Sequence, residues 1–246
     1  MSLPKLDSPT TEVFLPYSKK KIKIRPFTVK EEKLLLFAQN EKKMTAIVDA
    51  VKTVLKNCIV CGTNLETLPA FEVDYIFLKL RSLSVNNIVK LNIVDETKEV
   101  VEGETGYVEV ELDLDDVNLD ISKIPNDKIQ ISDKYWLKLK FPEYKENHDF
   151  SDEIFKENPA NIAFELVSNA VDSVYSDDGE EVYLLKDYSP DERREFFDSL
   201  TTQNFKQIQE YIANIPQLSY DLHYVNAAGE EKTKTLSGLN DFFMYA

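Results

Sequence analysis

The segment 65–94 constrains the fold more than any other part of the chain, because we expect it to form a helix that leads almost directly into a strand. Its first half carries apolar residues at helical spacing: Phe71, Tyr75, Leu78 and Leu83. Its second half carries apolar residues that alternate with polar ones: Val89, Leu91 and Ile93. A helix and a strand joined so closely must pack as one unit, so the rest of the chain is expected to fold onto them.

Helical and strand-like patterns alternate along the rest of the chain. Periodic apolar residues and capping signals predict further helices: 28–38, 42–57, 159–169, a helix from 190, 204–214 and a short aromatic helix near 239–245. Thr28 and Thr202 are the expected N-caps of the helices that follow them. Alternating apolar residues predict strands and hairpins: 12–15, 21–25, 107–114, 129–140, 173–185, 218–225 and 232–236. The predicted fold is therefore α+β, with helices packed against several antiparallel hairpins or ribbons.

The chain is long enough for two domains. The segment 142–149 is the best candidate for a linker, because it is polar and charged and contains a proline. We therefore expect an N-terminal α+β domain over 1–141 and a C-terminal α+β domain over 150–246. The order helix, tight turn, strand and ribbon occurs near 70–114 and again near 203–236, which would fit two similar halves.

The formal net charge of −15 argues against broad binding to nucleic acid or to anionic membranes, because their phosphates would repel the chain. The need for solubility is a sufficient explanation for the acidity, and binding to a basic partner is the more specific alternative. No apolar run approaches the roughly 20 residues that cross a bilayer, and the N-terminus lacks the apolar core of a secretory signal. The expected location is the cytoplasm.

Cys58 and Cys61 form the one spacing that could carry metal or redox chemistry. Zinc needs about four ligands, and the only other soft ligands, His148 and His223, are not paired at ligand spacing. A thioredoxin-like pair should open a helix, whereas this pair closes one. The simpler interpretation is two small apolar residues at the end of a core helix, and no metal or cofactor is predicted.

Other chemical motifs are weak. The segment 113–120 has the carboxylates of a calcium loop but lacks the glycine and the terminal glutamate of an EF-hand. Phosphate-binding, dinucleotide-binding, nucleophile-elbow and zinc-protease motifs do not occur in the sequence. The prediction is that the chain is not an enzyme and has no small-molecule substrate.

Two groups of residues could form an interface with a protein partner or a second copy. One is a basic hairpin turn, Lys19, Lys20 and Lys21, whose charges could equally be solvated edge charges. The other is the aromatic end, Phe242, Phe243, Met244 and Tyr245, which either docks on the core of the chain or contacts a partner. A further aromatic set is expected in the core: Phe14, Phe27, Phe37, Phe71, Tyr75 and Phe77.

Three long stretches stand out together: LPKLDSPTTEVFLPYSKKKIKIRPFTVKEEKLLLFA, LPAFEVDYIFLKLRSLSVNNIV and LSGLNDFF. They lie near the start, in the first third and at the end of the chain. In this order they resemble the baseplate hub assembly proteins of T-even-like contractile-tailed bacteriophages. The resemblance also implies ribbons with zinc-binding CxxC pairs, but the corresponding tips here, IVDETKEVVEGETG and VNAAGEEKT, contain no cysteine.

The resemblance implies a non-enzymatic factor that binds other tail and hub proteins while the baseplate hub is assembled in the host cytoplasm. Acidity and the lack of catalytic motifs favour a chaperone-like factor. The alternative is a structural hub subunit that stays in the virion baseplate. A third hypothesis is a tail-associated hydrolase that degrades the cell wall, but no distinctive acid pair supports it.

Overall fold

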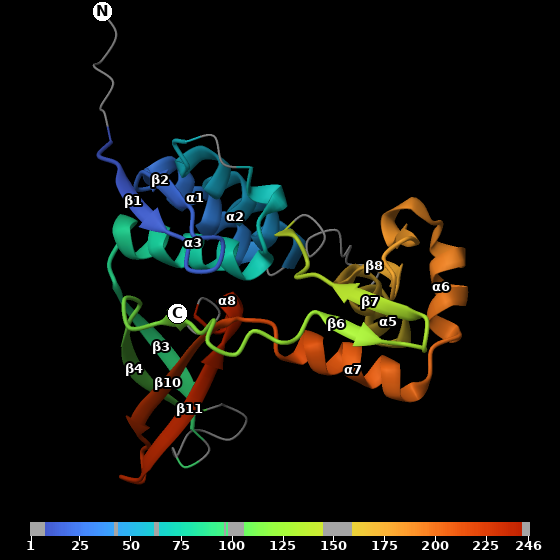
Figure 1. Cartoon of the computed structure of the whole chain (residues 1–246). Coiled ribbons are helices and arrows are strands. Elements are labelled where there is room, and N and C mark those ends of the chain that lie inside the picture. Colours follow the sequence, from blue (N-terminus) through green and yellow to red (C-terminus); the bar gives the residue numbers. More distant parts are fainter. Residues whose placement is uncertain are drawn as a thin grey trace, which may run out of the picture. The chain divides into compact units, whose positions relative to one another are not determined.

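The computed structural model describes residues 8–41, 44–61, 64–95, 97, 106–144 and 159–242. The chain forms two compact units (Figure 1), and we treat each by itself. Unit 1 contains Met1–Ile121 and Gln217–Ala246, and unit 2 contains Ser122–Pro216. Helices and antiparallel sheets occur in both units, which confirms the predicted α+β class. Within the described residues, no helix combines the length and the apolar character needed to span a membrane.

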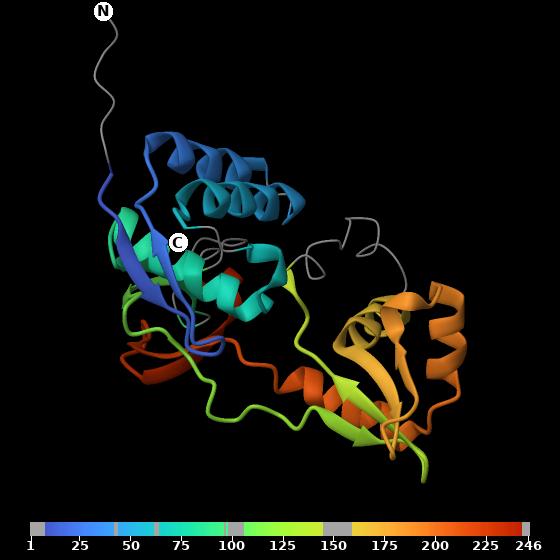
Figure 2. The same ribbon diagram turned by 45° about the horizontal axis from the view of Figure 1, so that its top comes forward.

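Unit 1 begins with a hairpin and a group of helices (Figure 2). The elements are β1 (Thr11–Phe14), β2 (Lys21–Ile24), α1 (Val29–Glu41), α2 (Met44–Cys58), the 3-10 helix η1 (Leu65–Thr67) and α3 (Ala70–Ser84). β1 and β2 pair antiparallel, with Thr11 opposite Ile24. The segment after α2 continues this sheet, because Ile59 forms a bridge with Ile24. The predicted helices and strands of this region are therefore present.

The predicted helix–strand unit is confirmed. One face of α3 is buried, and β3 (Ile88–Val94) follows after residues 85–87. β3 pairs antiparallel with β4 (Tyr107–Asp113) along its whole length, and its three alternating apolar residues point into the core: Val89, Leu91 and Ile93. The prediction was wrong for Leu83, which is 39% exposed because it lies in the last turn of α3, away from the buried face.

α3 also carries a partly exposed acid, Asp74, whose pKa is raised from 3.8 to about 7 by burial. Since the folded pKa exceeds the unfolded one, ionisation of Asp74 opposes folding, and its cost grows as the pH rises from about 4 to about 7. The full shift would correspond to about 4 kcal/mol, and solvent contact lowers this to about 1–2 kcal/mol. We therefore expect Asp74→Asn to stabilise the protein at pH 8 and to change it little at pH 4.

Urea unfolding at both pH values measures this effect. Asp49→Asn is the matched control, because Asp49 is an exposed helical aspartate in the same unit. An Asp74→Asn variant with the same pH dependence of unfolding as the unmodified protein would contradict the role assigned to burial.

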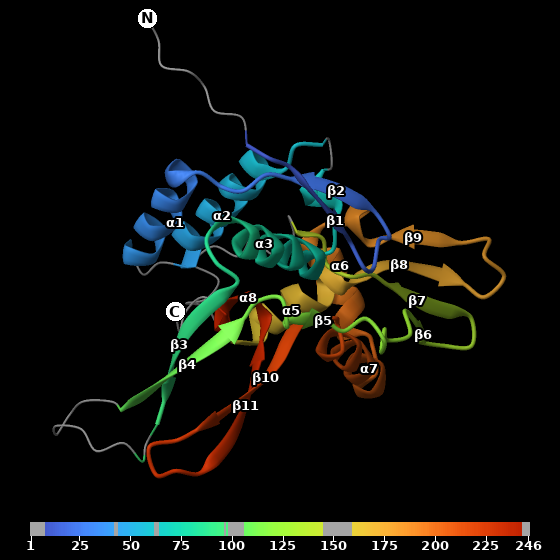
Figure 3. The ribbon, with the colours of Figure 1, turned by 90° about the vertical axis from the view of Figure 1, so that its left-hand side faces the viewer.

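The C-terminal ribbon belongs to unit 1 (Figure 3). β10 (Leu218–Val225) pairs with β11 (Glu231–Ser237) and, on its other edge, with β5 (Asn118–Leu119). α8 (Gly238–Asp241) then packs on α3 and on the ribbon. The end of β3 is tied to this ribbon as well, because the Ala227 N–H donates to Asp95 Oδ2 at 2.7 Å.

These long-range contacts produce a different division of the chain from the predicted domains 1–141 and 150–246. The predicted linker 142–149 lies partly outside the described residues. The predicted repeat of helix and ribbon is seen as α3–β3–β4 and as α7–β10–β11, but the second copy is split between the two units. Similarity between two halves therefore stays a prediction.

Unit 2 is a four-stranded antiparallel sheet with helices packed against it. The strand order is β6 (Lys128–Gln130), β7 (Tyr135–Leu139), β8 (Val171–Ser176) and β9 (Val182–Leu184). The other elements are α5 (Pro159–Ala170), the 3-10 helix η3 (Leu185–Asp187), α6 (Pro190–Asp198) and α7 (Thr202–Ala213). Sheet and helices share one core: Ile129, Leu137, Leu139, Val167, Val171, Val174, Leu185, Phe197, Ile208 and Tyr211.

Local sequence signals fix the helix starts and the turn in unit 2. Ser189 and Glu192 form a complete capping box at α6, with Pro190 at the first helical position. The predicted cap of α7 was wrong by one residue: Thr201, not Thr202, accepts the N–H of Asn204 at 3.1 Å. The predicted tight turn between β8 and β9 is present, and Gly179 there has φ of 74°.

Candidate protein-binding surfaces

The basic turn, which we define as Lys19–Lys21, leads from β1 into the first residue of β2 and is exposed. Two backbone hydrogen bonds close the turn: Leu15 N–H to Lys20 O at 2.8 Å and Lys19 N–H to Leu15 O at 3.1 Å. The Lys19 ammonium lies 5.9 Å from the centre of the Phe14 ring, and Lys21 faces Glu12 at 3.9 Å. The three predicted lysines are therefore exposed neighbours in one turn, and the side chains of Lys19 and Lys21 contact β1.

A buried carboxylate holds this turn in place. Glu72 on α3 is 0% exposed, and its Oε1 accepts the backbone N–H groups of Tyr17 at 2.9 Å and Ser18 at 2.7 Å. The Tyr17 ring also packs edge-on against Phe71, with centroids 5.6 Å apart. The lysines therefore project from a turn that is anchored to the central helix of unit 1. The sequence pattern did not indicate this anchoring role of Glu72.

The aromatic end of the chain lies differently. Phe242 is 0% exposed, so its side chain is part of the interior of unit 1 and does not share a surface with the basic turn. Phe243, Met244 and Tyr245 lie outside the described residues.

The cysteine pair is part of the hairpin packing. Burial raises the pKa of the Cys58 thiol to about 11, so this group stays protonated at neutral pH and is a poor nucleophile. Cys61 Sγ accepts the Lys23 N–H at 3.2 Å, next to the bridge between Ile59 and Ile24. Across the described ranges, His, Cys, Asp and Glu side chains do not gather in groups of three or more that could hold a metal ion.

The exposed face of α1 is a second apolar surface, and it corrects part of the predicted aromatic core. Phe37 is 66% exposed, with Val29 and Leu36 also exposed on the same helix. Phe14 is 50% exposed on the short edge strand β1. The predicted burial of both rings was therefore wrong. Phe37 is exposed because the apolar run of α1 continues around the helix and only one side of it meets the core, and Phe14 is exposed because it lies on a short two-stranded hairpin. Phe27, Phe71 and Phe77 are buried as expected.

Unit 2 contains a groove of about 580 Å³, which the sequence did not predict. We call it the α6 groove, and these residues line it: Ile131, Tyr135, Val174, Tyr183, Leu185, Tyr188, Glu192, Arg193, Glu195, Phe196 and Ser199. The lining is mostly apolar and aromatic, with charges from α6. Such a composition is typical of a binding site.

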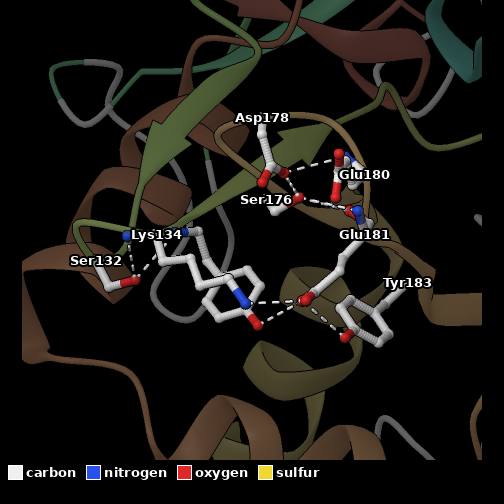
Figure 4. Close-up of polar contacts among 8 residues, drawn as sticks. Ser132, Lys134, Ser176, Asp178, Glu180, Glu181 and Tyr183 are labelled. Atoms are coloured by element: carbon white, nitrogen blue, oxygen red, sulfur yellow. Dashed lines mark hydrogen bonds and ion pairs between the residues drawn. The ribbon is translucent and has the colours of Figure 1, made fainter.

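A polar network fixes the aromatic wall of the α6 groove (Figure 4). The Glu181 carboxylate accepts hydrogen bonds from Tyr135 Oη at 2.6 Å, Lys134 Nζ at 2.9 Å and Tyr183 Oη at 3.1 Å. The bond from Tyr135, followed by those from Lys134 and Tyr183, lowers the pKa of Glu181. Glu181 is therefore ionised and a weak general base at neutral pH, and its evident role is to orient the two tyrosines.

The turn that carries Glu181 is itself held by side chains (Figure 4). Ser176 Oγ donates to Asp178 Oδ1 at 2.5 Å and accepts the Glu181 N–H at 2.9 Å. Asp178 Oδ1 also accepts the Glu180 N–H at 3.1 Å, and the Ser176 bond lowers the pKa of Asp178. This arrangement gives the groove a preformed wall, which reduces the entropy lost when a ligand binds.

Comparison with known proteins identifies the family. A family model described as T4 bacteriophage base plate protein matches residues 8–244. No curated protein and no solved structure matches the chain. The match confirms the resemblance to phage baseplate proteins seen in the sequence. Because it spans nearly the whole chain, this protein belongs to the T4 bacteriophage base plate protein family and has a role in the phage baseplate.

Proposed function

We propose that the chain is a non-enzymatic assembly factor for the baseplate hub. It binds other tail proteins in the host cytoplasm while the hub is built, and then leaves in the manner of a chaperone. The observation that carries the proposal is an apolar groove with carboxylates on its lining, in a baseplate-family chain of formal charge −15. A surface of this kind suits temporary shielding of a basic, apolar segment before that segment is buried in the hub.

The basic turn supplies a surface of opposite sign. Lys19, Lys20 and Lys21 project from a turn whose backbone is anchored by Glu72. Charged surfaces on an otherwise acidic protein orient an approaching partner and raise the association rate. The turn therefore favours binding to an acidic patch on a tail protein, separately from any partner of the α6 groove.

A structural hub subunit retained in the virion baseplate is the second candidate. The exposed apolar face of α1 favours it, because Val29, Leu36 and Phe37 would be covered permanently in an assembled particle. We place it second because the charged surfaces suit reversible contacts better than permanent ones.

Charge reversal at the basic turn tests the binding role. A chain with Lys19→Glu, Lys20→Glu and Lys21→Glu is supplied in infected cells to a phage that lacks its own copy of the gene. We expect at least about a tenfold loss of co-purified hub protein and of phage yield, because the electrostatic contact is reversed. Unchanged co-purification and yield would contradict the proposed role of this surface.

A control variant separates this effect from that of net charge. Lys123→Glu, Lys128→Glu and Lys206→Glu make the same change in charge at exposed, scattered positions of unit 2. We expect this variant to support normal yield, and equal losses for both variants would mean that net charge, and not the turn, is responsible.

A further inference from the structure

We infer that the α6 groove binds a segment of another tail protein in which an aliphatic or aromatic side chain is flanked by Lys or Arg. This inference rests on the proposed function, because it names the chemistry of one partner that an assembly factor would bind. It follows from three properties of the groove: its apolar floor, its fixed aromatic wall and the charge around it.

The floor of the groove is continuous with the core of unit 2. Val174 and Leu185 are core residues, and Ile131 and Phe196 pack against that core while lining the groove. A floor supported in this way is present before a ligand arrives. At about 580 Å³ the groove has room for the side chains of a short peptide segment, since ligand pockets run from roughly 300 to 1,000 Å³.

The wall consists of tyrosines whose orientation is fixed. The Tyr135 and Tyr183 rings lie 6.4 Å apart at 64°, and both hydroxyls donate to Glu181. Tyr188 adds a third ring, which is 39% exposed. Rigid tyrosines offer a large contact area to an apolar side chain at a low cost in conformational entropy.

The charge around the groove indicates which residues flank the apolar side chain of the partner segment. The segment 177–198, which supplies β9, η3 and α6, contains nine acidic and three basic residues, a formal charge of −6. Glu192 is fixed in the groove lining by hydrogen bonds from Ser189 N–H at 2.8 Å and Ser189 Oγ at 2.6 Å, and Glu195 lies one helical turn further on. A partner segment with Lys or Arg beside its apolar anchor would therefore be attracted, and an acidic one repelled.

The basic residues of α6 are already counted in this charge, and both of them contact α5. Arg193 also lines the groove, but its Nη1 lies 3.3 Å from Ser168 Oγ on α5. Arg194 lies over the Phe164 ring at 5.0 Å. Lys134 is held by Glu181 at 2.9 Å. Along α6 a partner in the groove would therefore meet two carboxylates, Glu192 and Glu195, and one guanidinium, Arg193, so the lining from this helix is acidic on balance.

Short overlapping peptides that cover the tail proteins of the same phage provide the test. The full chain is used to probe the peptides, and the affinity of each bound peptide is then measured in solution by fluorescence anisotropy at low and high salt. We expect bound peptides to share an apolar residue within a few positions of Lys or Arg, and to bind more weakly at high salt. Bound peptides without basic residues would overturn the inference.

Two variants locate the binding site. Glu195→Lys should weaken binding about fivefold to tenfold, and Tyr188→Ala about tenfold, because they remove a flanking charge and a wall ring. Glu210→Lys is the control, because this substitution makes the same change in charge as Glu195→Lys. Glu210 is an exposed glutamate on α7 of the same unit. Equal unfolding temperatures of the variants would show that the fold is intact.

The outcomes separate this inference from the proposed function. If the chain binds hub proteins but Glu195→Lys and Tyr188→Ala bind them equally well, the groove inference fails and the assembly role stands. If the chain binds no tail protein at all, the proposed function fails as well. A concentration-dependent dimer that Tyr188→Ala abolishes would assign the groove to a second copy and overturn the inference.

Discussion

Replacing Glu72 by alanine is expected to lower the free energy of unfolding by about 2–4 kcal/mol. The Glu72 carboxylate is fully buried and accepts two backbone N–H groups, from Tyr17 and Ser18. A buried donor that loses its acceptor costs about 1–3 kcal/mol, and the variant leaves both N–H groups without this acceptor. Urea unfolding followed by circular dichroism measures the change.

The same substitution should also loosen the basic turn, because Glu72 links the turn to α3. Faster proteolysis after Lys19, Lys20 or Lys21 would report this loosening in the folded protein. Glu66→Ala is the matched control, since Glu66 is a half-buried glutamate of unit 1 in a surface ion pair with Lys56 at 3.4 Å, worth at most about 1 kcal/mol. Equal destabilisation by the two substitutions would contradict the anchoring role of Glu72.

The second large effect is a loss of stability in acid that depends on Glu31. Burial alone would raise the pKa of Glu31, but hydrogen bonds from Thr28 and Arg25 outweigh it and lower the pKa from 4.5 to about 2. The Thr28 N–H lies 2.8 Å from Oε2, and Arg25 Nη2 lies 3.0 Å from Oε1. Since the folded pKa is below the unfolded one, this stabilisation is complete above pH 4.5 and is lost as the pH falls from 4.5 to 2.

The lowered pKa of Glu31 corresponds to about 3 kcal/mol of stability. We expect Glu31→Gln to destabilise the protein by a similar amount at pH 7 and to remove the loss of stability between pH 4.5 and pH 2 that Glu31 causes. Chemical unfolding at pH 7 and pH 3 measures both effects. Glu41→Gln, at the exposed end of α1, is the control. If Glu31→Gln unfolded in acid with the same pH dependence as the unmodified protein, the network of Thr28, Arg25 and Glu31 would not be its source.

The local elements could be predicted because their signals are local. The periodicity of 70–94 predicted α3 and β3, and Ser189 with Pro190 predicted the start of α6. Side-chain burial was harder to predict where the apolar residues of a helix cover more than one of its faces. Phe37 belongs to such a run in α1, and only the contacts of that helix decide that the ring is exposed.

Long-range structure could not be predicted in this way. The pairing of Leu218 with Leu119 joins segments almost a hundred residues apart, and the pattern of neither strand specifies its partner. This pairing, together with the packing of α8 on α3, places the C-terminal ribbon in unit 1.

The candidate surfaces show the same contrast. A run of lysines in a predicted turn was sufficient to locate the basic turn. Its anchor, Glu72, is 55 residues away from Tyr17, and no sequence pattern indicates that these two residues are in contact. The α6 groove combines residues from 131 to 199, so it exists only after the sheet and α6 have packed. Clustered tyrosines and acids over 177–198 were its one sequence signal.

The assembly role is tested most directly by measuring how much of this protein is present in free hub intermediates and in mature particles. Quantitative mass spectrometry of both fractions from infected cells gives the number of copies relative to the hub proteins. We predict that the chain co-purifies with intermediates and is absent from mature particles. A fixed number of copies in mature particles would contradict the assembly factor and make the chain a structural subunit of the baseplate hub.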